Sequence, residues 1–300
     1  MIPTKLKSFA TLGRVLGALF LAGPAVVKAQ FNLFATGYTT GDIYQYTSGG
    51  TRSTFASAVV TGPQGMTFDS AGNLFVSDNL GSIFRFTPGG TQSVFAPMLA
   101  HGLAFNSAGN LFVGGNDGSA QIYMYTPSGT RSVFGSIGTV PLGLAFDSTG
   151  NLFVGGLNGN IYKFTPGGAL STFATGAGMP VGLAFNSSGD LFVTDNIGGA
   201  IYDYPAAGVR STFATGLTGG SGLAFDSSNN LYVADSRFGS GFIYRYTPGG
   251  SRSTFASGLV TPSQLAFQPV VVPEPSTLAL LLGGLVLVGF RVRRSRQVPA

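Results

Sequence analysis

The chain has 300 residues, no cysteine and a formal net charge of +5 at pH 7. Half of its sixteen Lys and Arg residues lie before residue 30 or after residue 272, and the stretch between holds eight basic residues against ten Asp, a net charge of −2. This stretch has no basic surface to neutralise phosphates, so nucleic acid is excluded as an expected partner. The absence of cysteine excludes a disulfide framework.

Residues 1–29 have the pattern of a secretory signal peptide. Three basic residues, Lys5, Lys7 and Arg14, lead into an apolar run over residues 15–27. Val27-Lys28-Ala29 follows as a small-residue cleavage site. The alternative, an amphipathic helix packed on the domain, would need a charged face, and none accompanies the apolar run. We expect signal peptidase to cleave after Ala29 and the mature chain to begin near Gln30.

Residues 30–268 repeat one pattern six times, at an interval of about forty residues. A period of this length indicates an array of similar supersecondary units, none of which buries its apolar face without a neighbour. The most complete copy consists of Gly143-Leu144-Ala145-Phe146-Asp147, Asn151-Leu152-Phe153-Val154, Ile161-Tyr162-Lys163-Phe164, Thr165-Pro166-Gly167-Gly168 and Ser171-Thr172-Phe173.

Each copy predicts four short strands. The first ends in a Phe such as Phe185, the second has the form Leu-Phe-Val, the third joins an Ile to aromatic residues, and the fourth ends in a Phe such as Phe213. Asp147 to Asn151 predicts a turn that a side chain caps and a glycine completes with a positive φ; Asn229 replaces that glycine in one copy and tolerates the same conformation. Thr-Pro-Gly-Gly predicts a second hairpin turn, so each copy is expected to form an antiparallel meander.

Four strands in about forty residues, repeated radially, is the pattern of a β-propeller blade. Six copies predict an all-β, six-bladed propeller with four-stranded antiparallel blades. The array begins with a second strand at Leu33 and ends with a lone first strand, Gln264-Leu265-Ala266-Phe267. These ends are expected to share one blade and close the ring, which removes an exposed sheet edge. A solenoid, the alternative, would need capping repeats at its ends.

The absence of Trp excludes the tryptophan-bearing WD40 pattern. The phrase Gly-Leu-Ala-Phe-Asp, Gly-Asn-Leu-Phe-Val and Ile-Tyr-x-Tyr instead resembles NHL repeats and the related SMP-30/gluconolactonase-like six-bladed propellers over residues 30–268. In the lactonases of this group, the resemblance implies a divalent metal at the channel mouth, held by a Glu and by Asn or Asp residues, some of which directly precede the glycine of an innermost strand.

The positions that precede this glycine hold no carboxylate and no Asn: they are Gln64, His101, Leu142, Val181, Ser221 and Ser263. The sole Glu of the chain is Glu274, outside the repeats. We therefore expect no metal and no cofactor. His101, the only histidine, has no carboxylate partner that the sequence can assign, which argues against a catalytic role. His101 and Gln64 remain candidate ligand contacts at the channel.

At three further positions of the repeat, several copies carry the same type of side chain, and each such set has a functional and a structural interpretation. Asp78, Asp195 and Asp235 follow the second strand; they are weak candidates for a cation rim, and loop capping is the alternative that we favour. Arg52, Arg131, Arg210 and Arg252 begin the outermost strand, where we expect them to block edge pairing rather than to bind acidic polysaccharide. Aromatic pairs such as Tyr123 with Tyr125 and Tyr202 with Tyr204 are expected to pack between blades rather than to stack on sugars.

Residues 269–300 form a tail of their own. Val272-Pro273-Glu274-Pro275 precedes an apolar segment, expected to be a helix over about residues 276–290, and the cluster Arg291, Arg293, Arg294 and Arg296 follows. As a helix these fifteen residues extend roughly 22 Å at about 1.5 Å per residue, less than the roughly 30 Å of a bilayer core. They suit a temporary tether, with the arginines on the cytoplasmic side and the repeats outside.

This tail resembles the PEP-CTERM sorting signal of Gram-negative bacteria. The resemblance implies that an exosortase, a membrane protease, recognises Pro273-Glu274-Pro275, removes the tail and releases the protein from a transient inner-membrane anchor to the cell surface or an exopolysaccharide matrix. The expected function is noncatalytic binding or structure there, with extracellular polysaccharide or a surface protein as partner. Two alternatives stay open: a lactonase-like or lyase-like enzyme with a degenerate metal site, and a scaffold that binds proteins on the faces of the ring.

Overall fold

The structure, a computed structural model, describes residues 32–205, 209–236 and 240–269. All of them belong to one compact unit of the chain, residues 31–300. The predicted signal peptide, its cleavage site at Ala29, the residues Pro273, Glu274 and Pro275 and the predicted helix over 276–290 lie outside the described residues. Among the residues that are described, no helix is long and apolar enough to cross a membrane.

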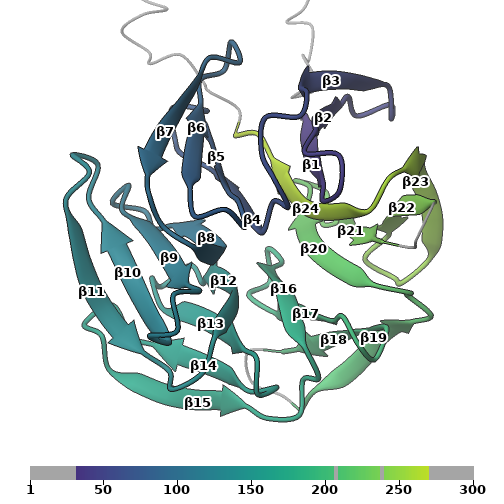
Figure 1. The fold of residues 1–300 in the computed structure, drawn as a ribbon. Helices are drawn as coiled ribbons and strands as arrows, with labels where there is room; N and C mark the ends of the chain where they lie inside the picture. Colours follow the sequence, from purple (N-terminus) through teal and green to yellow (C-terminus); the bar gives the residue numbers. More distant parts are fainter. Residues whose placement is uncertain (1–31, 206–208, 237–239, 270–300) are drawn as a thin grey trace, which may run out of the picture. The chain divides into compact units, whose positions relative to one another are not determined.

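The described residues form six antiparallel sheets of four strands, arranged as blades around an axis (Figure 1). In blades A to F the innermost strands are β24 (Pro262–Phe267), β4 (Gly65–Phe68), β8 (Ala100–Phe105), β12 (Pro141–Phe146), β16 (Pro180–Phe185) and β20 (Gly220–Phe225). The second strands, in the same order, are β1 (Leu33–Gly37), β5 (Leu74–Ser77), β9 (Leu111–Gly115), β13 (Leu152–Gly156), β17 (Leu191–Asp195) and β21 (Leu231–Asp235).

The two remaining strands of each blade lie progressively further from the axis. The third strands are β2 (Ile43–Tyr46), β6 (Ile83–Phe86), β10 (Gln121–Tyr125), β14 (Ile161–Phe164), β18 (Ala200–Tyr204) and β22 (Gly241–Tyr246). The outermost strands are β3 (Arg52–Ala56), β7 (Gln92–Ala96), β11 (Arg131–Ser136), β15 (Leu170–Ala174), β19 (Ser211–Thr215) and β23 (Arg252–Leu259). The predicted blade number and strand order are confirmed.

Blade A is built from both ends of the propeller. The sheet order is β24-β1-β2-β3, and Leu33 of β1 pairs with Phe267 of β24. Packing of innermost strands continues around the ring and closes from β20 to β24 and from β24 to β4. The predicted sharing of one blade by the two ends is therefore confirmed, and a solenoid is excluded.

Aromatic side chains join each blade to the next. Phe75 of the second strand of blade B packs edge-to-face on Phe95 of its own blade and on Phe105 of blade C, both with ring centroids 5.1 Å apart. The same trio recurs in every blade, and Tyr232 closes the ring by packing on Phe267 at 5.2 Å. Edge-to-face aromatic pairs at this separation stabilise the fold by more than the burial of their apolar surface alone.

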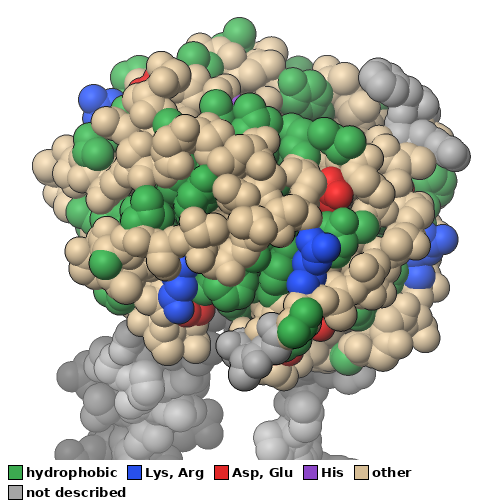
Figure 2. All heavy atoms as spheres, turned by 90° about the horizontal axis from the view of Figure 1, so that it is seen from below, with side chains coloured by type: hydrophobic (Ala, Val, Ile, Leu, Met, Phe, Trp, Pro, Cys, Tyr) green, Lys and Arg blue, Asp and Glu red, His purple; other side chains and the backbone are tan. Residues whose placement is uncertain are grey.

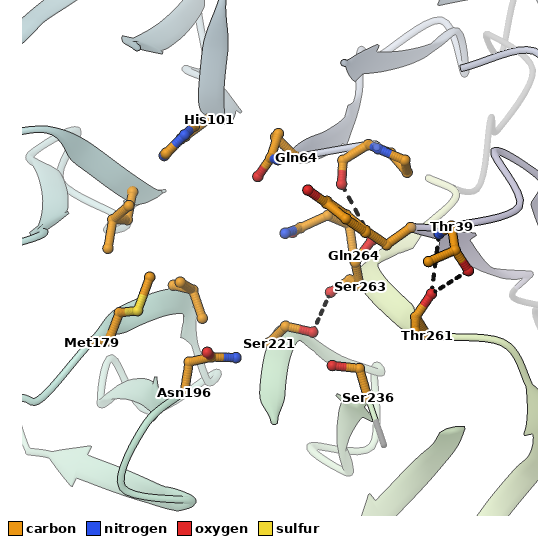
Figure 3. A pocket seen from close by; sticks show the side chains of 14 residues that line it. Thr39, Gln64, His101, Met179, Asn196, Ser221, Ser236, Thr261, Ser263 and Gln264 are labelled. Atoms are coloured by element: carbon orange, nitrogen blue, oxygen red, sulfur yellow. Dashed lines mark hydrogen bonds between the residues drawn. The ribbon is translucent and has the colours of Figure 1, made fainter. Parts of the chain in front are cut away.

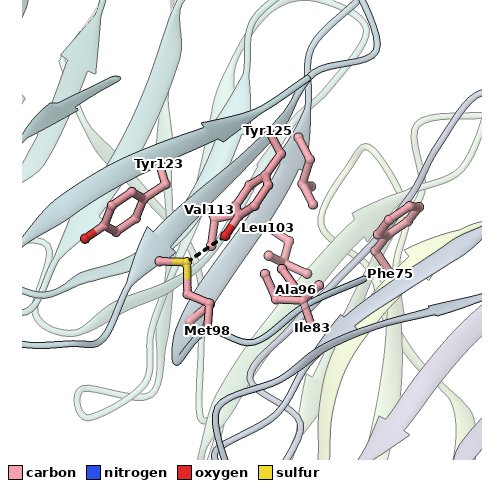
Figure 4. Close-up of a cluster of buried hydrophobic side chains, with 10 residues drawn as sticks. Phe75, Ile83, Ala96, Met98, Leu103, Val113, Tyr123 and Tyr125 are labelled. Atoms are coloured by element: carbon pink, nitrogen blue, oxygen red, sulfur yellow. Dashed lines mark hydrogen bonds between the residues drawn. The ribbon is translucent and has the colours of Figure 1, made fainter. Parts of the chain in front are cut away.

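Six apolar clusters fill the spaces between neighbouring blades. In the cluster between blades B and C, the Tyr125 hydroxyl donates to the Met98 sulfur at 3.4 Å (Figure 4). The second strands are buried along their whole length, because neighbouring blades cover both faces. All six clusters and the closing strand pair lie between residues 33 and 267, so this stretch contains the complete propeller.

The turns adopt the conformations that the sequence predicts. Gly72, Gly150 and Gly189 have positive φ angles of 80°, 85° and 86°, and Asn229, which replaces the glycine in blade F, has φ 60°. Asp147 accepts hydrogen bonds from the backbone N–H groups of Thr149 and Asn151 at 2.9 and 2.8 Å and so caps its turn. These turns all lie at one face of the ring, and the starts of the innermost strands lie at the other.

Candidate functional site

A cavity of about 440 Å³ opens at the axis, on the face where the innermost strands begin (Figure 3). All six residues that precede the inner-strand glycine position line it, so the structure brings Gln64 and His101 together with their counterparts in the other blades. The further lining residues are Tyr38, Thr39, Pro63, Met179, Asn196, Ser236, Thr261 and Gln264. We call this cavity the mouth pocket.

Glycine allows the innermost strands to lie close together around the mouth pocket, because it has no side chain. A Cβ atom on Gly143 would lie 2.5 Å from the backbone carbonyl oxygen of Val181 in the next blade, and Gly65, Gly102, Gly182 and Gly222 are similarly confined. The column is broken once, because blade A has Gln264 where the others have glycine. Its side chain points into the pocket (Figure 3).

Most hydroxyl groups of the pocket are bound within the protein. Ser221 donates to the backbone oxygen of Ser263 at 2.7 Å, and Ser236 donates to that of Gly219 at 3.1 Å. Thr39 and Thr261 share a hydrogen bond between their hydroxyl oxygens at 2.9 Å. These side chains thus tie loops and neighbouring blades together.

The amides and the imidazole differ from the hydroxyls. Within the described part of the chain, the side-chain amides of Gln64 and Gln264 and the imidazole of His101 form no hydrogen bond with the protein. Asn196 uses its amide nitrogen to donate to the Gly220 oxygen at 3.1 Å, which leaves its amide oxygen facing other partners. These groups offer donors and acceptors to a ligand.

The mouth pocket is electrically neutral. Its lining, over the described residues, contains no Asp, Glu, Lys or Arg. Burial lowers the pKa of the His101 imidazole below its ordinary value of 6.5, so this ring is neutral at pH 7. A neutral lining favours an uncharged ligand, because burying an unpaired charge is costly.

The divalent metal that the lactonase resemblance implies does not fit these residues. Hard cations prefer oxygen ligands and usually carboxylates, whereas the pocket offers amide and hydroxyl oxygens. Elsewhere in the described ranges, no three His, Cys, Asp or Glu side chains come together as a metal site would require.

Asp78, Asp195 and Asp235 are buried and cap loops. Asp78 accepts from the N–H of Ser82 at 2.8 Å, and Asp235 accepts from that of Gly219 at 2.8 Å. Asp195 accepts from the N–H of Met179 at 3.0 Å, so it holds one lining residue of the pocket in place. Each carboxylate is thus occupied by backbone donors of its own or the adjoining loop.

The arginine column lies over tyrosine rings on the outer part of the blades. The guanidinium carbons of Arg52, Arg131, Arg210 and Arg252 lie 5.2, 5.1, 4.5 and 4.8 Å from the ring centroids of Tyr44, Tyr123, Tyr202 and Tyr244. These are cation–π distances. Seen from the side, the ring carries isolated charged groups among hydrophobic and uncharged polar atoms (Figure 2).

A second cavity, of about 400 Å³, lies between blades B and C and includes the turn face. Phe75, Phe95, Phe105 and Tyr125 line it together with Arg85 and Asp69. The repeat pattern did not indicate this cavity, which involves two blades only.

Comparison with known proteins identifies the tail and the fold. Residues 271–296 match the PEP-CTERM protein-sorting motif. This motif implies export, processing by exosortase and membrane-associated sorting to the cell surface. The sequence has no match among curated proteins.

Several solved structures share the propeller at low sequence identity. A chain of a nidogen/laminin complex is similar with a TM-score of 0.70 and 20% identity, over 81% of this chain and 100% of that one. A catalytically inactive virginiamycin B lyase from Staphylococcus aureus, solved with quinupristin, gives 0.59 and 15% over 81% and 94%. A putative gluconolactonase gives 0.58 and 18% over 70% and 86%. At these identities the similarity establishes the fold, and these proteins include both binding partners and enzymes.

Proposed function

We propose that this protein is an exported, exosortase-sorted propeller that acts without catalysis at the cell surface or in its matrix, where it binds an uncharged ligand in the mouth pocket. One observation carries the proposal: six blades converge on a neutral pocket in which two glutamine amides and an imidazole are left for a ligand. Its volume of about 440 Å³ lies within the usual range of small-molecule sites.

The chemistry of the lining supports binding rather than catalysis. General acid and base catalysis needs a proton-transfer group held by an orienting partner. His101 is the ionisable imidazole of the pocket, and no carboxylate lines the pocket beside it among the described residues. The enzyme alternative needs the metal of the lactonases, which the donor set does not suit.

The sorting motif supports the proposed place of action. A protein that is exported and processed at the membrane meets surface polymers and surface proteins first. Extracellular polysaccharide is therefore the partner that we propose. A surface protein, bound across one of the flat faces of the ring, is the second candidate.

The proposal is tested by placing a charge in the mouth pocket. Val181→Glu should abolish binding of the neutral fraction of the producer's extracellular polysaccharide, since the carboxylate would be buried against the ligand. Val133→Glu is the matched control, because Val133 is 57% exposed on outer strand β11 and should leave binding unchanged. Equal binding by both variants would place the site elsewhere.

A metal titration separates the enzyme alternative. We expect calcium, magnesium and zinc not to bind, so they should leave the thermal midpoint of unfolding unchanged. A metal ion that bound only the folded state would raise this midpoint. A clear metal-dependent rise would favour a lactonase-like or lyase-like activity.

A further inference from the structure

The mouth pocket has two chemically different sides. Three consecutive blades, A to C, contribute Gln264, Gln64 and His101 as a continuous arc (Figure 3). Blades D and E contribute the apolar side chains of Leu142, Val181 and Met179. Met179 lies across the pocket from the two glutamines, with the Asn196 amide beside it (Figure 3). A ligand that fills the pocket therefore meets the two glutamine amides on one side, and on the other side three apolar side chains together with the Asn196 amide.

The Gln264 amide is a departure from the repeat. Gln264 stands where five blades have glycine, and the close approach of neighbouring backbones makes any side chain at those other positions costly. The Gln264 backbone N–H donates to the Thr36 hydroxyl at 3.1 Å, which fixes the strand while its amide stays free to face the pocket. The amide of Gln64 enters the pocket from the next blade.

The NH₂ group of a primary amide can donate a hydrogen bond to the carbonyl oxygen of another amide. In an acetamido group the N–H and the C=O point in opposite directions, so its carbonyl oxygen would accept from the Gln264 and Gln64 amides while its methyl group would face the apolar side of Leu142, Val181 and Met179. An acetamido group combines these two parts and carries no charge. Resting on the proposed function, we infer that the mouth pocket recognises the acetamido group of a neutral, N-acetylated sugar unit.

The neutrality of the pocket favours a glycan over a peptide. The pocket is enclosed by all six blades, so a polymer enters it with an end or a branch. The end of an unmodified peptide carries an ammonium or a carboxylate, and no charged residue of the described lining would pair with it. The end of a neutral polysaccharide carries hydroxyl groups and no charge.

The test compares ligands that differ in one group. The exported protein, purified as its producing cells process it, is titrated with tri-N-acetylchitotriose and with cellotriose, which has a hydroxyl in place of each acetamido group. We expect the acetylated sugar to bind at least about tenfold more tightly, a difference near 1.4 kcal/mol. N-formyl-trialanine amide, a peptide with neither charges nor an acetyl group, is titrated beside them.

Variants connect this preference to the two glutamines. Gln64→Met and Gln264→Met keep the size of each side chain and should each weaken binding of the acetylated sugar about fivefold, the effect of losing one neutral hydrogen bond. Gln264→Gly restores the residue of the other five blades and is a second variant that the fold accommodates. Gln45→Met on β2, outside the pocket, is the control and should leave affinity unchanged.

Each result decides the inference. Preference for the acetylated sugar that both glutamine variants reduce supports it. Equal binding of the two sugars, reduced by Val181→Glu, overturns the acetamido inference and leaves the proposed binding function intact. Binding of the peptide alone overturns it in favour of a polypeptide ligand. Absence of binding to tri-N-acetylchitotriose up to about 10 mM also overturns it.

Discussion

Gly65 packs so closely against the backbone carbonyl oxygen of His101 that a Cβ atom would overlap with it. His101 lines the mouth pocket from blade C, and Gly65 begins the innermost strand of blade B. The Ser77 hydroxyl donates to the same oxygen at 3.0 Å. The contact that sets the spacing of two blades therefore also sets the position of a pocket residue.

Gly65→Ala should destabilise the propeller by about 1–3 kcal/mol, because the added methyl meets backbone atoms that cannot move independently. Gly65 does not have a positive φ, so the expected loss is steric. Gly167→Ala is the control, since its Cβ would meet a side-chain oxygen at 3.9 Å, an ordinary contact. Denaturant unfolding of both variants measures the difference, and equal stability would contradict the close packing of the innermost strands.

The Thr194 hydroxyl links blades E and F. It is fully buried, donates to the Ser221 oxygen at 2.8 Å and accepts from the Gly182 N–H at 2.9 Å. Thr194→Val keeps the shape and leaves both partners unsatisfied, so unfolding free energy should fall by about 1–3 kcal/mol. Thr212→Val, exposed on β19, should change it by less than about 0.5 kcal/mol. A similar small effect of both changes would show that this link contributes nothing to stability.

His101 should make stability depend on pH below its ordinary pKa of 6.5. Burial lowers its pKa in the folded state, so the unfolded chain takes up a proton first and is stabilised relative to the folded chain as the pH falls below 6.5. The unfolding free energy of the wild type, relative to His101→Asn, should therefore be constant above pH 7 and decrease below 6.5. Urea unfolding of both proteins across this range tests the effect; because they share all other ionisable groups, parallel pH profiles would contradict a buried neutral imidazole.

The tail should control where the protein is found. Replacing Pro273, Glu274 and Pro275 by alanine removes the residues after which the sorting motif is named and should leave the protein in the membrane fraction. Replacing Gln297, Val298 and Pro299, outside the matched residues 271–296, is the control and should leave sorting unchanged. Immunoblots of membrane, surface and medium fractions give the answer, and normal release of the first variant would show that sorting does not use this motif.

The fold could be predicted from the sequence because each local signal agrees with the architecture. The period of about forty residues corresponds to one four-stranded blade. Phe and Leu recur at positions that face neighbouring blades. The incomplete first and last copies together make one complete blade. The left-handed conformation of Asn229 followed from its place in the glycine column. Because local turns and long-range packing agree in this way, the fold of a repeat protein can be predicted from its amino-acid sequence.

The pocket was predictable only in part. The column that contains Gln64 and His101 was apparent, whereas Gln264 was missed, although its replacement of glycine was a visible signal in the sequence. Asn196 and Met179 enter the pocket from loops. The Met179 loop is held by a hydrogen bond from the Met179 N–H to the Asp195 carboxylate, which sequence spacing does not reveal. Which hydroxyls are bound and which amides are free depends on contacts between blades, as between Ser221 and Ser263.

The most direct test of the account is a methyl NMR spectrum of the protein labelled at its methionines. Met179 lines the mouth pocket, whereas Met66 and Met98 are buried between blades and Met124 lies on β10. On addition of the neutral fraction of the producer's extracellular polysaccharide, the Met179 signal, assigned with Met179→Leu, should shift while that of Met124 stays in place. A binding-dependent shift confined to the other methionines, or no shift at all, would contradict a ligand site at the mouth of the ring.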